Sequence, residues 1–121
     1  MLLAIALTGA AGAPARYLVE RAVTARAGST FPWGTWLVNV SGSLVLGLVT
    51  GLALYHGLAT DARVVAGVGF LGSYTTFSTF VFEAVELPRR PGGSGPAVYV
   101  AASTVAGLAA ATAGLLVAAA V

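Results

Sequence analysis

The chain has 121 residues, of which 58% are hydrophobic and only 8% are charged, and its formal net charge is +2. With a mean hydropathy of +0.92, it falls far short of the roughly one quarter of charged residues that a soluble domain carries. Because the apolar runs are continuous rather than alternating, they predict a helical membrane protein and not a β-barrel. The few basic residues form no long cluster, which leaves a nucleic-acid partner unsupported. The absence of cysteine excludes disulfides and thiolate metal sites.

Four apolar segments are long enough to cross a bilayer, and together they form one membrane domain with no room for a soluble one. The first covers residues 2–19 and is rich in the small residues that suit close helix contact. No basic residue precedes its apolar run, so it is interpreted as a retained span rather than a secretory signal. The second covers residues 33–55, begins at two tryptophans typical of a membrane interface, and carries Asn39 in uncharged surroundings.

The third segment, residues 62–85, has glycines and hydroxyl side chains crowded into its middle. Gly72 loosens the backbone there and the β-branched Thr75 weakens the helix further. Lipid offers no partners to such groups, so they must face protein or a water-filled path. We therefore predict a broken helix whose freed carbonyl groups hold a cation. The alternative is a regular helix whose hydroxyl groups bond back to their own turn.

The residues that follow the predicted break form a candidate path for an anion. Phe77 and Phe80 are three residues apart and share a helix face, which Glu83 continues. The positive edges of aromatic rings can contact a small anion, and the interleaved hydroxyl groups of Ser78 and Thr79 can donate hydrogen bonds to it. Lipid-facing or packing phenylalanines are the alternative, and Glu83 is either interfacial or part of the path.

Further candidates lie on the other segments. The fourth segment, residues 97–121, carries Tyr99 and Ser103 one turn apart, where they either extend a polar track or mark the interface. The Asn39 amide can donate to a neighbouring helix or to an anion. Arg16 either attracts anions at a vestibule or anchors the first segment at the interface.

The arginines suggest an orientation. The first and third connectors hold most of them, whereas Arg63 alone lies in the second, so the positive-inside rule predicts both chain termini outside; the arginines of the first and third connectors are Arg21, Arg26, Arg89 and Arg90. Four spans are also too thin a bundle to enclose a wide aqueous route, so we expect self-association or a related partner.

The third-segment motif Gly-Phe-Leu-Gly-Ser-Tyr-Thr-Thr-Phe-Ser-Thr-Phe (residues 69–80), with Gly-Thr-Trp-Leu-Val-Asn (34–39) and the small residues before Arg16-Tyr17, resembles the Fluc/CrcB fluoride channels. The resemblance spans nearly the whole chain. It implies an antiparallel dimer of four-span chains, with a discontinuous third helix and two pores. The implied activity is passive, fluoride-selective conduction that exports toxic fluoride across a bacterial cell membrane, and not an enzymatic reaction.

The resemblance also implies roles for individual residues. A structural Na⁺ at the dimer centre is held by main-chain carbonyls that match Gly72 and Thr75. The pore groups match Phe77, Phe80 and Asn39, with a hydroxyl track through Ser78, Thr79, Tyr99 and Ser103. Two departures weaken the match, because Gly107 and Ala111 lack hydroxyl groups that relatives often carry and Ser73 stands where many have glycine.

Two further hypotheses remain beside the channel. A small proton-coupled drug exporter also has four spans and forms dimers, but it needs a membrane-buried carboxylate, and the first segment has no acid before Glu20. A non-transporting assembly subunit explains the small residues but leaves the hydroxyl-rich break without a purpose. An antiparallel homodimer requires one chain to insert in both orientations, which calls for nearly balanced basic residues at its two ends. The arginines here are unevenly distributed, which slightly favours a related, opposite-facing partner over a second copy of the chain.

Overall fold

The computed structural model describes residues 1–121 and contains helices and no strands. Three segments form single helices: α1 (Leu2–Ala27), α2 (Trp33–Tyr55) and α6 (Pro96–Ala120). The third segment is divided. It consists of α3 (Thr60–Val64), the π-helical stretch η1 (Val65–Leu71), α4 (Gly72–Tyr74), α5 (Ser78–Glu86) and the short 3₁₀ turn η2 (Leu87–Arg89). The predicted fold class, four helical spans with a broken third one, is confirmed.

The outer surface of this bundle is apolar. Four segments are long and apolar enough to cross a membrane, namely Leu2–Ala27, Trp33–Tyr55, Thr60–Arg89 and Pro96–Ala120. Only 15 of the 121 residues are buried, and large side chains such as Leu7 and Leu108 remain more than 60% exposed. A soluble protein does not leave so much apolar surface in water. The chain is therefore a multi-pass membrane protein whose surface is covered by lipid or by another subunit.

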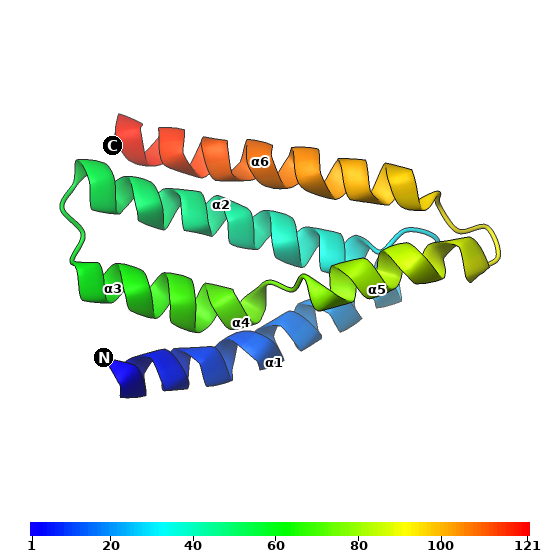
Figure 1. The fold of residues 1–121 in the computed structure, drawn as a ribbon, viewed down its shortest axis with the longest axis horizontal. Coiled ribbons are helices and arrows are strands. Elements are labelled where there is room, and N and C mark those ends of the chain that lie inside the picture. Colours follow the sequence, from blue (N-terminus) through cyan, green and yellow to red (C-terminus); the bar gives the residue numbers. More distant parts are fainter.

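The helices run side by side in alternating directions (Figure 1). α2 and α6 lie against each other along their length, while α1 crosses beneath the divided third segment. Both chain termini and the α2–α3 connection lie at one end of the bundle. The α1–α2 and α5–α6 connections meet at the other end, where the Ser94 amide donates to the Thr30 carbonyl at 2.8 Å. The first and third connectors thus lie on the same side, as the sequence predicts.

Glycines set the closest approaches between helices. A methyl group at Gly47 of α2 would overlap the backbone of Ala111 in α6, and one at Gly114 would overlap the backbone of Leu44. Gly12 of α1 faces the third segment in the same way, against the side chain of Ser73. Small residues let helices pack closely in lipid, where no hydrophobic force drives them together. The role expected of the small residues is therefore seen between α2 and α6 and between α1 and the third segment.

One boundary differs from the expectation. Arg21 and Arg26, placed in a connector by the sequence analysis, lie on the last turns of α1, which continues to Ala27 and ends at Gly28 with φ 79°. The expected boundary followed the loss of apolarity after residue 19, but the residues that follow still favour a helix until the glycine ends it. The extra turns are held by α2, because Gly34 packs directly on the backbone of Glu20.

Candidate functional site

The third segment breaks in the middle of its span. α4 ends at Tyr74, Thr75 has an extended backbone (φ −74°, ψ 159°), and α5 begins at Ser78. The Thr75 amide and hydroxyl both still donate to the Leu71 carbonyl at 2.9 Å, and the Ser73 hydroxyl bonds back to Gly69 at 3.0 Å. The predicted break is confirmed. The alternative of hydroxyl groups bonding to their own turn describes these two side chains, but not the residues that follow.

Asn39 of α2 holds the break open. Its side-chain nitrogen donates to the Thr76 carbonyl at 2.8 Å, and its side-chain oxygen accepts from the Thr76 amide, also at 2.8 Å. The buried peptide groups of the break are thereby satisfied by one amide side chain, as burial in a membrane requires. Asn39 has one N–H left over for another acceptor. The structure thus shows that the Asn39 side chain bonds to a neighbouring segment, and one of its N–H groups remains available as a donor.

This pairing changes what happens one turn earlier. In a regular helix the Thr76 amide would donate to the carbonyl of Gly72, four residues before it. It donates to Asn39 instead, so the Gly72 carbonyl loses that partner. The Thr75 carbonyl, also outside the helical ladder, accepts from Arg16 Nη1 at 3.3 Å. Arg16 therefore points from α1 to the break itself.

Thr76 also organises the start of α5. Its hydroxyl donates to Thr79 Oγ1 at 3.1 Å, accepts from the Thr79 amide at 3.1 Å, and lies 3.4 Å from Ser78 Oγ. An oxygen that accepts from an amide of the first helical turn stabilises the helix start as a capping side chain does, although here it comes from the residue before Phe77, which directly precedes α5. From sequence alone, Thr76 is a β-branched residue of the third-segment motif and its role at the start of α5 is not evident. Its position three residues before Thr79 was the available signal.

An open pocket of about 430 Å³ lies beside the break. Six residues predicted for the site line it: Asn39, Gly72, Thr75, Phe77, Phe80 and Ser103. The remaining wall includes Ser43, Thr76 and Thr104 and has no charged side chain. The structure therefore gathers residues of three spans into one uncharged, partly polar cavity.

The two phenylalanines form the aromatic part of this wall. The ring centroids of Phe77 and Phe80 are 5.9 Å apart and their planes are tilted by 37°. Phe80 also lies 5.2 Å from the ring of Tyr99, whereas Phe77, at the break, is 77% exposed. The predicted pairing is present, with the Phe80 ring half-buried against Tyr99 and the Phe77 ring exposed.

Two hydroxyl groups of α6, those of Tyr99 and Ser103, are buried without a hydrogen bond of normal geometry, and Thr35 is a candidate partner of the Tyr99 hydroxyl. Ser103 lines the pocket, while Tyr99 is fully buried behind Phe80. Buried polar atoms are nearly always paired, so an unpaired hydroxyl calls for a functional explanation. Further along α6 the polar wall ends, since Gly107 faces Ser43 and Ala111 packs on α2.

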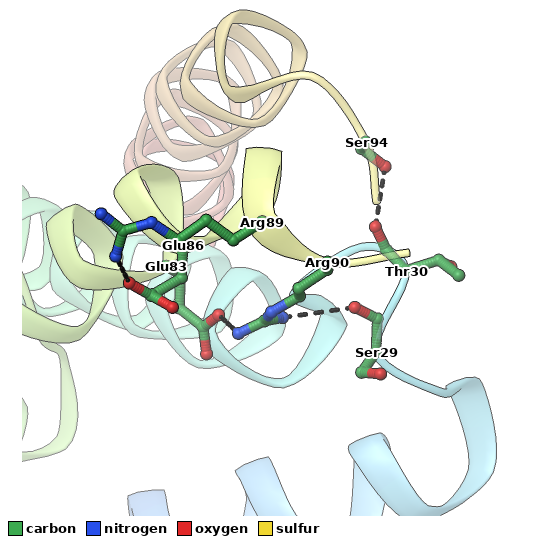
Figure 2. A network of polar contacts seen from close by, with 7 residues as sticks. All are labelled: Ser29, Thr30, Glu83, Glu86, Arg89, Arg90 and Ser94. Carbon is green, nitrogen blue, oxygen red and sulfur yellow. Dashed lines mark hydrogen bonds and ion pairs between the residues drawn. The ribbon is translucent and has the colours of Figure 1, made fainter. Parts of the chain in front are cut away.

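Two further predicted residues, Thr79 and Glu83, lie toward the basic end of the bundle, where the α1–α2 and α5–α6 connections meet. Thr79 and Glu83 line a second pocket of about 410 Å³, between α1, the α1–α2 connector and α5. The Glu83 carboxylate there forms an ion pair with Arg90 (Figure 2). The pairing of these two residues is not evident from the sequence, because seven positions and the η2 turn separate them.

Any metal at the break would have to be held by uncharged oxygens, including those of the backbone. The chain has no group of three or more His, Cys, Asp or Glu side chains that could hold a metal ion. The Gly72 and Thr75 carbonyls are hard oxygen donors, which suits a hard cation. Two such oxygens are fewer than the roughly six or more that a hard cation takes, so the break of one chain does not complete a cation site by itself.

Three continuous helices and one discontinuous helix, with a polar pocket at the discontinuity, define a small polytopic membrane protein built around a broken span. The family described as CrcB-like protein, Camphor Resistance (CrcB), matches residues 3–115, and the chain belongs to this family. The family resemblance stated from the sequence is confirmed.

Similar proteins carry names that describe ion channels rather than enzymes. "Fluoride-specific ion channel FluC 1" of Symbiobacterium thermophilum is 50% identical over 92% of this chain and 91% of its own length. The protein of the same name from Leifsonia xyli is 50% identical over 74% of this chain and 66% of its own length. That of Streptomyces avermitilis is 43% identical over 86% and 84%. These bacterial channel names agree with the predictions of a bacterial membrane protein that is not an enzyme.

Proposed function

We propose that the chain is a passive, fluoride-selective channel that exports fluoride from the cytoplasm. The names of its relatives support this proposal, and one observation carries it. The pocket at the break brings together an amide, several hydroxyl groups and two aromatic rings, and has no cationic side chain. Such a wall is suited to an anion that must bind weakly and leave again.

The chemistry of fluoride matches these groups. Fluoride is small and holds its water tightly, so a narrow pathway must replace that water with hydrogen-bond donors. The second N–H of Asn39 and the unpaired hydroxyl groups of Tyr99 and Ser103 can supply them. The ring edges of Phe77 and Phe80 add weaker polarisation. A guanidinium or ammonium group in the same place would trap the ion, whereas a series of modest sites permits conduction.

A second chain completes the proposed channel. The pocket is open on the side where Gly72 and Phe77 are exposed, so an antiparallel partner at this face would close it. The same contact would bring two pairs of Gly72 and Thr75 carbonyls together around Na⁺, which supplies a fixed positive charge between the two broken helices. Each Thr75 oxygen has a second lone pair beside the one that faces Arg16.

The partner is either a second copy or a related chain that faces the opposite way. Arg21, Arg26, Arg89 and Arg90 lie at one end of the bundle and Arg63 at the other, which supports the orientation with both termini outside. This bias slightly favours the related chain. Purification of the chain expressed alone decides the matter, because a well-behaved homodimer that conducts fluoride would refute the requirement for a different partner.

The main test is fluoride efflux from liposomes that contain the purified protein, followed with a fluoride-selective electrode. We expect rapid efflux of fluoride, no comparable efflux of chloride, and no dependence on a proton gradient. Protein-free liposomes are the control. If reconstituted protein passes neither anion but exchanges protons for a lipophilic cation, the exporter hypothesis replaces the channel.

The proposed Na⁺ site has its own test. Replacing Na⁺ with N-methylglucamine should lower the thermal unfolding temperature of the purified dimer, and returning Na⁺ should restore it. Equal unfolding temperatures in both salts at equal ionic strength would argue against a structural Na⁺, whatever the transport result.

A further inference from the structure

The ion pair between Glu83 and Arg90 lies beside the proposed anion path. Glu83 is one helical turn beyond Thr79, and its side chain is only 19% exposed; that of Arg90 is 28% exposed. A carboxylate in this position repels an anion unless its charge is compensated. Arg90 is the group that compensates it, and it comes from the connector beyond α5 rather than from a pore helix.

Arg90 is also tied to the opposite connector. Its Nη1 donates to the Ser29 carbonyl at 3.2 Å, and nearby Ser94 binds the Thr30 carbonyl through its amide at 2.8 Å and its hydroxyl at 3.1 Å (Figure 2). The guanidinium is therefore held between α5 and the α1–α2 connector. Its neighbour Arg89 differs, because it pairs with Glu86 only one turn away and its side chain is 72% exposed.

The second pocket connects this ion pair to the break. It is lined by two carboxylates and two guanidinium groups, those of Glu20, Glu83, Arg21 and Arg90, so its formal charges balance. It also contacts Thr79, whose hydroxyl accepts from Thr76, and Thr76 lines the pocket at the break. We call this second pocket, whose formal charges cancel, the vestibule. The hydroxyl pair Thr76–Thr79 thus joins the vestibule, which Thr79 lines, to the uncharged pocket at the break, which Thr76 lines.

We propose that Arg90 is a positioning residue for anion passage: it holds the Glu83 carboxylate aside and cancels its charge where the vestibule meets Thr79. This inference rests on the proposed fluoride channel. Without Arg90 the vestibule has two carboxylates against one guanidinium, and Glu83 is free to turn toward Thr79. Repulsion between like charges a few ångströms apart is strong in such partly buried surroundings, so fluoride would be excluded from this end of the path.

The test is a double-mutant cycle measured by fluoride efflux. We expect Arg90→Gln to slow efflux about tenfold, because one uncompensated charge acts at short range. The matched control Arg89→Gln should stay within about twofold, as an exposed pair contributes little. Glu83→Gln combined with Arg90→Gln should return to the rate of Glu83→Gln alone. Arg90→Lys, which keeps the charge, should retain most of the wild-type rate.

A second readout separates charge from loop structure. Raising the ionic strength with impermeant salt should partly restore efflux in Arg90→Gln, since screening shortens the range of the Glu83 charge. A double variant as slow as Arg90→Gln, with a lowered unfolding temperature and no response to salt, would show a structural tie only and overturn the inference. So would an Arg90→Gln variant as fast as wild type, while the channel itself would stand. A wild-type protein that passes no fluoride would overturn both.

Discussion

The α2–α6 pair and the divided third segment differ in where their polar groups find hydrogen-bond partners within the membrane. In α6 the hydroxyl groups of Thr104 and Thr112 bond back to carbonyls of their own helix at 2.9 Å, and glycines press the pair together. At the break, the amide and hydroxyl of Thr76 bind groups outside the regular ladder. The difference shows that a hydroxyl in a span is informative only once its partner is known. The α2–α6 pair provides a closely packed frame, and the break exposes polar atoms to the pocket.

The largest expected effect is the loss of transport at the aromatic wall. Phe80→Ile should lower fluoride efflux by about a hundredfold or more, because an aliphatic side chain has no positive edge to present to the anion. Phe82→Ile is the control, since Phe82 is 62% exposed on α5 and does not line the pocket. Size-exclusion chromatography should show an unchanged dimer. Unchanged efflux in Phe80→Ile would support the non-transporting assembly subunit.

The support of the break by α2 should appear as stability. Asn39→Ala leaves the amide and carbonyl of Thr76 without partners, and an unsatisfied buried group costs about 1–3 kcal/mol. We expect a clear drop in the free energy of unfolding measured in detergent, together with reduced efflux. Thr112→Ala, which removes a bond within one exposed turn, is the control. Equal unfolding of the two variants would mean that Asn39 does not hold the break.

The frame itself should be sensitive to added volume rather than to polarity. Gly47→Ala places a methyl group against the backbone of Ala111, so the helices must separate, at a cost of about 1–3 kcal/mol. At Gly67 the nearest atom to an added methyl is 3.8 Å away, in a Leu46 side chain, so Gly67→Ala should be tolerated. Thermal unfolding of both variants compares the two sites. A tolerated Gly47→Ala would show that the α2–α6 contact is looser than the glycines indicate.

The smallest effect is expected outside both regions. Glu86→Gln removes the exposed ion pair with Arg89 and should change the free energy of unfolding by less than about 1 kcal/mol. Fluoride efflux should not change. A large loss of efflux in this variant would show that the charge of Glu86, rather than that of Glu83, affects anion passage at this end of the bundle.

Composition and local pattern predicted much of this architecture. The four spans follow from their apolar lengths, and the break follows from glycine, hydroxyl and β-branched residues in one span. The Phe77–Phe80 pairing also follows from spacing alone. These features depend on residues close together in the chain, which is why a single sequence reveals them.

The features that were missed depend on contacts between distant residues. That both polar ends of Asn39 bind Thr76 is a consequence of how α2 faces the third segment. The pairing of Glu83 with Arg90 depends on the path of the chain through η2. The continuation of α1 to Ala27 reflects support from α2 after the apolar pattern has ended. Tertiary packing decides each of these, and local pattern does not record it.

The π-helical stretch η1 makes the segment intolerant of length changes. Each residue of an α-helix turns the chain by about 100°, whereas a π-helical turn takes up more residues, so the number of residues in η1 determines which side of the later chain faces α2. Before the stretch ends, Gly69 already packs on Thr8 of α1; after it, Thr76 meets Asn39 of α2. A single-residue deletion at 70 or 71 would leave the first contact in place and displace the second, so point substitutions there should be milder than insertions or deletions.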